Sequence, residues 1–169
     1  VVTERFPGSR TAAISILVEC GRRDEQPGEY GLAHLSEHMH FQGTNCRTSL
    51  DILRQVDGLG GQVGAFTTRD YTTYFACVAD DYRFHALDLL ADLLLNSTYP
   101  DDCLERERRV ILEEARDLED NPSRLAEALL KGAVWPGSAL GRPLTGTPEA
   151  LARLTREDVI YFVHRNYTP

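Results

Sequence analysis

Apolar and polar residues alternate along three segments of the chain, and this two-residue period predicts β-strands. Residues 11–20 form the first, which is followed by a loop rich in glycine, proline and charge that extends to Tyr30. Residues 62–68 and 72–79 form the other two and are separated only by a short turn at Arg69-Asp70. Their close spacing predicts a β-hairpin.

A period of 3.6 residues governs most of the remaining chain and predicts helices. We expect helices over residues 31–41, 51–59, 80–96, 101–120, 123–134 and 155–165. The last should begin at a capping box formed by Thr155 and Asp158. One buried face is expected in the third, made of Phe84, Leu87, Leu90, Ala91 and Leu94. Helices beside a hairpin, without regular alternation of strand and helix, predict an α+β fold.

Composition narrows the class of protein. The chain has 169 residues, 42% of them hydrophobic, which is enough to bury the core of a single domain. A net charge of -8 without a basic cluster argues against nucleic acid or an anionic membrane as a partner. No apolar run approaches the length of a membrane-spanning helix. Lys131 is the only lysine among 18 basic residues, a bias typical of GC-rich bacterial genomes.

The four cysteines are scattered along the chain at Cys20, Cys46, Cys77 and Cys103. They form no C-x-x-C pair, so the sequence predicts neither a disulfide framework nor a structural zinc cluster. Cys20 and Cys77 lie in or beside apolar segments and are expected to be small buried hydrophobes. This use of cysteine favours a reducing, cytoplasmic setting.

The segment His34-Leu35-Ser36-Glu37-His38 carries the candidate chemistry. It reads H-x-x-E-H, the motif of the inverzincins, which reverses the zinc-protease motif H-E-x-x-H. Residues four apart share one face of a helix, so His34 and His38 can bind one zinc ion. Glu37 lies about 100° further round the helix, where it can face the same pocket as a general base without being a ligand.

A catalytic zinc site usually has three protein ligands, and the predicted helix over residues 101–120 offers the third. Its apolar stripe is formed by Leu104, Ile111, Ala115 and Leu118. Glu107 and Glu114 fall within about 60° of Ile111, inside that stripe. A carboxylate there is costly unless it is paired or bound to a metal. We therefore predict Glu114 as the ligand, and Glu107 as a residue that supports the bound ligands or as an alternative ligand.

The other interpretation of this segment is a charged surface helix stabilised by pairs of glutamate and arginine. We adopt that interpretation for Glu105 and Glu113. Glu113 lies about 160° from Ile111, on the side expected to face water.

Two stretches of the chain resemble the pitrilysin/insulinase-type zinc metallopeptidases. They are H-L-S-E-H-M-H-F-Q-G-T, which starts at His34, and E-R-R-V-I-L-E-E, which ends at Glu114. In that family a distal glutamate follows the second histidine by about 76 residues, and Glu114 follows His38 by 76. A family acid seven residues upstream matches Glu107. The smaller, processing-peptidase-like members are the most similar, because this chain carries no long insertions.

The resemblance extends over nearly the whole chain and implies a sheet with helices packed mainly on one side. Gly64, Ala65, Phe66 and Thr67 are similar to the edge strand on which a peptide substrate adds as a further strand. Residues 141–149 resemble the loop before the closing helix, and Tyr167-Thr168-Pro169 resembles the turn that ends it. The family's metal-bearing domain continues past this turn and a homologous second half follows. We therefore expect residues 1–169 to be one incomplete domain that needs a second domain or a partner subunit.

Two residues depart from the family pattern. Gly64 stands where the family usually has asparagine, so one side-chain contact to substrate is expected to be absent. His40 replaces an aliphatic residue and lies about 200° round the helix from His38, so we predict a partly exposed residue that is not a ligand.

Together these features predict a zinc-dependent endopeptidase that hydrolyses peptides or unfolded segments. Zn²⁺ would be bound by His34, His38 and Glu114, and Glu37 would activate the water at the remaining position. One alternative is a catalytically inactive or partner-dependent subunit of the same family. A second is a purely structural zinc site, for which Cys46 is the only cysteine close enough in sequence to be a fourth ligand.

Overall fold

A small antiparallel sheet forms the base of the fold in the computed structural model, which describes residues 1–168. Its strands are β1 (Thr11–Val18), β2 (Gln62–Thr67) and β3 (Thr72–Ala79), in the order β1-β3-β2. The predicted hairpin is therefore confirmed, and β3 pairs with both of its neighbours. Pro169, the last residue of the predicted closing turn, lies outside the described residues.

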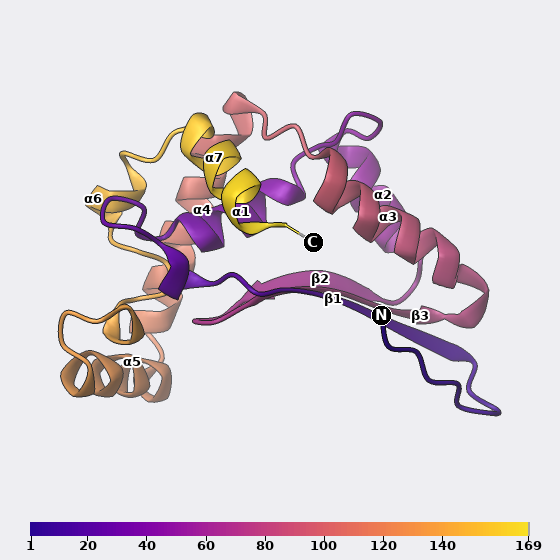
Figure 1. Cartoon of the computed structure of the whole chain (residues 1–169), viewed down its shortest axis with the longest axis horizontal. Helices are drawn as coiled ribbons and strands as arrows, with labels where there is room; N and C mark the ends of the chain where they lie inside the picture. Colours follow the sequence, from indigo (N-terminus) through magenta and orange to yellow (C-terminus); the bar gives the residue numbers. More distant parts are fainter. Residues whose placement is uncertain (169) are drawn as a thin grey trace.

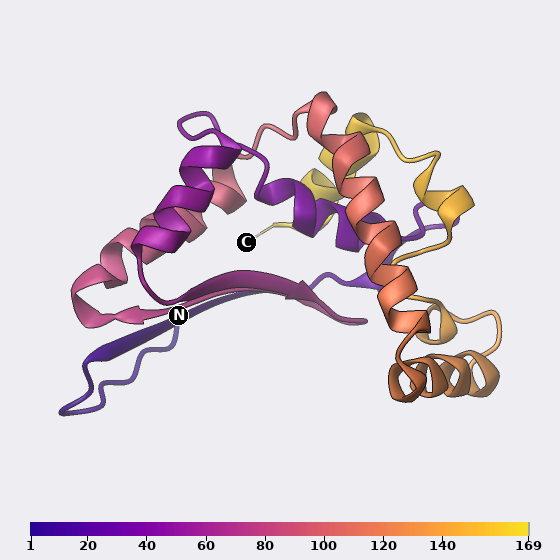
Figure 2. The same cartoon turned by 180° about the vertical axis from the view of Figure 1, so that it is seen from behind.

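The described part of the chain also contains seven α-helices. They are α1 (Leu32–His40), α2 (Ser49–Gly58), α3 (Arg83–Asn96), α4 (Asp101–Glu119), α5 (Pro122–Val134), α6 (Pro148–Leu151) and α7 (Arg156–Asn166). Figures 1 and 2 show α1, α2, α3 and α7 on one side of the sheet, with α5 set apart at the far end of α4. This is the α+β arrangement that the sequence predicted. Over residues 1–168, no helix combines the length and apolarity that crossing a membrane would require.

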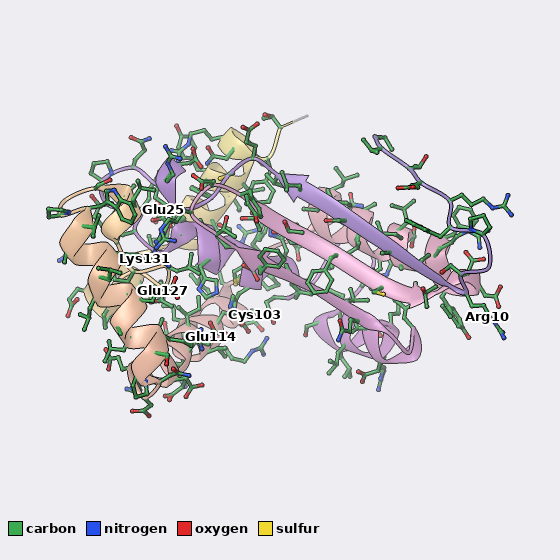
Figure 3. All side chains as sticks on the ribbon, turned by 90° about the horizontal axis from the view of Figure 1, so that it is seen from below. Arg10, Glu25, Cys103, Glu114, Glu127 and Lys131 are labelled. Carbon is green, nitrogen blue, oxygen red and sulfur yellow. The ribbon has the colours of Figure 1, made fainter. Side chains whose placement is uncertain are left out.

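The two faces of the sheet have different surroundings. The side chains of Tyr74, Ala76 and Val78 on β3 are buried against the helices. Phe75 and Cys77 alternate with them, and Figure 3 looks onto this opposite, open face. Cys77 is exposed there, so the prediction that it is a buried hydrophobe was wrong. The apolar setting of its neighbours gave no information about which face it occupies, because strand positions alternate.

Two hydrophobic clusters make up the core, and they share residues at their junction. The first gathers α1, α4 and α7 around Leu35, Ile111 and Phe162. The second packs α2 and α3 onto the helix-facing side of the sheet. Val18 and Tyr167 pack against both clusters. The end of β1 and the residue after α7 thus join the helical half of the molecule to the sheet.

His40 lies at this junction in a cage of tyrosines. It is 0% exposed, so the expectation of a partly exposed histidine was wrong. Its Nδ1 donates to the backbone oxygen of Ser36 at 2.6 Å, which leaves Nε2 to accept from the hydroxyl of Tyr99 at 3.1 Å. Tyr167 stacks on the ring, with centroids 5.3 Å apart, and the Tyr74 hydroxyl lies 3.0 Å from Nδ1. Burial lowers the pKa of His40 to about 4, so the ring is neutral.

Tyr99 holds its position in this cage with an unusual backbone. It has φ +49°, a left-handed conformation that is disfavoured for a bulky residue. Arg156 at the start of α7 donates to its backbone oxygen at 2.7 Å, while its hydroxyl reaches His40. Contacts at both ends of Tyr99 compensate for the conformation.

The start of α1 depends on a glycine and a buried acid. Gly31 has φ +93°, and a Cβ there would lie 2.7 Å from the backbone oxygen of Thr145. Oε1 of Glu25 accepts from the backbone N–H groups of Gly31 at 3.1 Å and of Ala33 at 3.0 Å. These are donors that the first turn of a helix leaves without intrahelical partners. Burial raises the pKa of Glu25 to about 7.

Some predicted elements differ in their details. The capping box of α7 is present as predicted, but α2 begins at Ser49 because Thr48 and Asp51 form a capping box that was not anticipated. Helix α6 was also missed. The predicted face of α3 was right for Leu90 but wrong for Phe84, which is 66% exposed; the buried stripe is Ala86, Leu89, Leu90 and Leu93. Leucines occur on several sides of α3, so its sequence contains two stripes with helical spacing that could be buried. The contact with β3 determines which stripe is buried.

We predict that Glu25→Gln will remove a pH dependence of stability. Because the pKa of Glu25 is raised from 4.5 to about 7 on folding, the folded state binds more protons than the unfolded state between these values. The parent should therefore lose stability, relative to the variant, as pH rises through this window, by at most roughly 1.4 kcal/mol per pH unit. Urea unfolding at several pH values measures this difference. Parallel curves for the parent and Glu25→Gln would contradict it; the exposed Glu19→Gln is the control.

Tyr99→Phe should destabilise the fold by about 1–3 kcal/mol, because it leaves Nε2 of His40 buried without its donor. Thermal or denaturant unfolding measures the change. Tyr161→Phe is the matched control, since Tyr161 is exposed. Equal stability of the two variants would mean that the cage hydroxyl is unimportant.

Candidate metal centre

Helix α1 presents two imidazoles to one point. His34 and His38 are one turn apart, and their rings meet edge to face with centroids 4.6 Å apart. Their Nε2 atoms face each other at 3.2 Å. The buried neighbours Leu32, Leu35 and Met39 anchor the other side of this helix in the core. The orientation of the histidines is thus set by the amphipathic pattern of α1.

Helix α4 brings a carboxylate to the same point. Figure 2 shows α4 crossing α1, and Figure 3 labels Glu114 on it. Oε2 of Glu114 lies 3.5 Å from Nε2 of His34, and Oε1 lies 3.7 Å from Nε2 of His38. Its side chain is 44% exposed, more than a position inside the buried stripe would suggest. Glu114 therefore lies at the solvent-accessible side of the pair of histidines.

These separations fit a zinc ion. With zinc–nitrogen and zinc–oxygen distances of about 2.0–2.2 Å in a tetrahedral site, the ligand atoms lie roughly 3.3–3.5 Å from one another. The ligand atoms of His34, His38 and Glu114 all lie within 4.8 Å of one another. Two histidines and one glutamate are also the ligand set of catalytic zinc sites that keep a fourth position open. The residues present can therefore hold the metal.

A buried acid orients the second histidine. Oε2 of Glu107 accepts from Nδ1 of His38 at 3.1 Å, and Glu107 is only 7% exposed. With the proton on Nδ1, the lone pair of Nε2 points toward His34 and Glu114. Arg106 lies 3.4 Å from the other oxygen of Glu107 and donates to Gln42, whose amide lies 3.4 Å from the backbone oxygen of His38. These contacts form a closed ring between α1 and α4.

The pKa values of the two histidines shift in opposite directions. Burial, and then the neighbouring His38, lowers the pKa of His34 to about 3, so His34 is neutral as a metal ligand must be. Burial also acts to lower the pKa of His38, but its hydrogen bond to Glu107 and the charges of the surrounding carboxylates raise it. Nδ1 of His34 is buried and has no hydrogen-bond partner within residues 1–168.

Glu37 lies on the same helix and turns toward the sheet. Its side chain is buried, and Oε2 accepts from the hydroxyl of Thr67, the last residue of β2, at 2.5 Å. Burial raises the pKa of Glu37, while the hydrogen bond from Thr67 and the charge of His38 act against this rise. The acid is therefore positioned next to the histidine pair without being one of the three grouped ligands.

The structure brings together His34, His38 and Glu114, with Glu107 behind His38 and Glu37 beside it. Glu105 and Glu113 pair with Arg108 and Arg116 on the surface. Cys46 is exposed and is not part of the group, so the described residues give no fourth protein ligand.

Sequence reasoning missed the contacts made by Thr67, Arg106 and Gln42. Thr67 could have been noticed, since it follows Val63 and Ala65 on the helix-facing side of β2, where a polar residue needs a partner. Arg106 and Gln42 gave no comparable signal.

Comparisons with known proteins give similarity to one family of peptidases. A family model described as insulinase (peptidase family M16) matches residues 1–148. The "Uncharacterized zinc protease YmxG" of Bacillus subtilis is 38% identical over 169 residues, which is 100% of this chain and 41% of that protein. A "Probable mitochondrial-processing peptidase subunit beta" of Arabidopsis thaliana is 34% identical over 168 residues, 99% of this chain and 32% of that protein. The chain thus spans well under half the length of these curated relatives.

Solved structures show the same fold. A protease from Helicobacter pylori superimposes with a TM-score of 0.87 at 23% identity, covering 95% of this chain and 39% of that one. A peptidase M16 inactive domain from Pseudomonas fluorescens gives 0.80 at 20% identity, covering 92% of this chain and 38% of that one.

We expect substitutions at three glutamates of α4 to differ in their effect on zinc affinity. Glu114→Gln should lower the affinity most, because it removes a carboxylate beside both histidines. Glu107→Gln should lower it about 10–100-fold by releasing His38. Glu113→Gln is the control, since Glu113 pairs with Arg116 on the surface. Competition titration with a zinc chelator measures all three; unchanged affinity in Glu114→Gln would rule out the assigned ligand set.

Proposed function

This chain belongs to the insulinase family of peptidases, family M16, and we propose that it is the metal-bearing domain of a zinc-dependent endopeptidase. Family membership supports a peptidase-type function with zinc as the cofactor. The observation that carries the finer proposal is the convergence of His34, His38 and Glu114, with Glu37 alongside. We propose peptides and unfolded segments as substrates.

Zinc bound by His34, His38 and Glu114 would supply Lewis-acid chemistry, polarising a peptide carbonyl and making a water easier to deprotonate. The residues of the chain would prepare the site for this chemistry. Glu107 would keep Nε2 of His38 free of its proton, and the core packing of α1 would fix the spacing of the two histidines.

Glu37 would move the proton. As a carboxylate it would take a proton from the attacking water while the water oxygen bonds to the peptide carbon. It would then pass this proton to the departing nitrogen as the carbon–nitrogen bond breaks. The burial of Glu37 supports this role, because it raises the pKa of the carboxyl group toward neutral pH. A group with such a pKa can both accept and donate a proton efficiently.

The free edge of β2 would hold the substrate. β2 pairs with β3 on one side, and among the described residues no strand pairs with its other side. Gly64, Ala65, Phe66 and Thr67 would present backbone groups to an extended peptide, a mode that depends little on substrate sequence. Support comes from Thr67, which ends this edge and contacts Glu37, so a peptide lying along β2 would run toward the site.

A second domain or partner subunit would complete the enzyme. Relatives and structural neighbours are longer than this chain, and one relative is named as a subunit. We also propose a cytoplasmic setting, which the four free cysteines support.

The alternative is a subunit that is inactive or depends on its partner. It is favoured by the likeness to a domain described as inactive, although a likeness at 20% identity concerns the fold alone. The intact set of His34, Glu37, His38 and Glu114 argues against it.

Glu37→Gln should abolish hydrolysis and leave zinc binding unchanged. Loss of a positioned acid–base group lowers rates by about 10²–10⁴-fold. Cleavage of quenched-fluorescent peptides by the purified protein measures the rate, and metal analysis measures zinc. Glu105→Gln, at an exposed position on α4, is the control. Full activity in Glu37→Gln would refute the assigned role, and activity that appears only after addition of the partner half would favour the alternative.

A further inference from the structure

The hydrogen bond between Glu37 and Thr67 joins two separate parts of the proposed enzyme. Glu37 lies on the metal-bearing helix α1, and Thr67 ends the strand β2 whose edge would hold the substrate. Their side-chain oxygens are 2.5 Å apart, and both residues are buried. A hydroxyl that donates to a carboxylate makes a charge-assisted hydrogen bond.

The hydroxyl of Thr67 has little freedom to turn elsewhere. Its nearest alternative is Oγ1 of Thr72, at 3.3 Å across the hairpin. The hydroxyl of Thr72 donates to the backbone oxygen of Cys20 at 2.9 Å. Thr72 can therefore accept from Thr67 but leaves no proton to give it. The chain of donors runs in one direction, and the shorter contact directs the proton of Thr67 to Glu37.

This anchor distinguishes the two oxygens of Glu37. Oε2 accepts from the hydroxyl of Thr67, and the carboxylate also has a hydrogen bond from the Thr67 backbone, while within residues 1–168 Oε1 accepts from no other side chain. A glutamate carboxylate that is hydrogen-bonded through one oxygen cannot rotate about the Cγ–Cδ bond without losing that contact. Oε1 is thus the oxygen available to a water in the site.

We propose that Thr67 is the positioning residue of Glu37, holding Oε2 so that Oε1 faces the reacting water. This inference rests on the proposed function, in which Glu37 is the general base. Because Thr67 belongs to β2, the strand proposed to bind the substrate would also orient Glu37. Thr67 pairs with Thr72 across the hairpin, and this pairing fixes the register of β2 against β3.

Two substitutions at Thr67 test the role. Thr67→Val has the same shape without the hydroxyl and should lower kcat about 10–100-fold with little change in KM, because the backbone edge of β2 is unchanged. Thr67→Ser restores the hydroxyl and should recover kcat to within about threefold of the parent. Thr73→Val is the matched control, since Thr73 is as buried as Thr67, at 6%, and makes no hydrogen bond to Glu37.

A double-variant cycle separates positioning from a general effect on the fold. If Thr67 acts through Glu37, adding Thr67→Val to Glu37→Gln should cause no further loss of the residual rate. A further loss equal to that in the parent background would overturn the proposal. Quenched-fluorescent peptides derived from unfolded casein serve as the probe for all variants.

Crystal structures of the zinc-loaded parent and of Thr67→Val provide a readout that does not need activity. We expect the carboxylate of Glu37 to rotate or split between orientations in the variant, with His34 and His38 unmoved. An unchanged Glu37 would overturn the proposal. A displaced Glu37 in a protein whose parent cleaves no peptide would support the positioning role and reject the proposed function.

Discussion

The hydrogen bond between His38 and Glu107 is the interaction on which the rest of the site depends. A carboxylate that is 7% exposed at a contact between helices is costly to bury unless it has a partner. Nδ1 of His38 supplies that partner at 3.1 Å, which ties the register of α4 to that of α1. Glu114 lies two turns further along α4, so this one pairing also determines where its carboxylate meets the two histidines.

The parts of this arrangement that were predictable from sequence are those encoded by local periodicity. The spacing of His34 and His38 places both on one face of any helix, and the stripe through Leu104 and Ile111 places Glu107 inside a packed contact. Helix existence, the hairpin and the α+β class follow from similar patterns. Such patterns predict structure reliably because an amphipathic stripe has one way to be buried against a single neighbouring layer.

What could not be predicted depends on contacts between distant segments. His40 points away from the metal face, but only the positions of Tyr99 and Tyr167 turn that direction into a fully buried cage. On α3, leucines on several sides allowed two stripes, and packing against β3 decided between them. The contact of Thr67 with Glu37 spans the sheet and a helix, so no local spacing encodes it.

The unpaired side of β2 has a consequence for the behaviour of the protein in concentrated solution. Its six residues, Gln62 to Thr67, include no charged side chain, no proline and no bulge among the described residues. Natural proteins use these devices to keep exposed strands from pairing with one another. The unpaired backbone groups of such an edge can pair with the same edge of another copy. Covering this edge, or placing a charge on it, should therefore improve colloidal stability at high protein concentration.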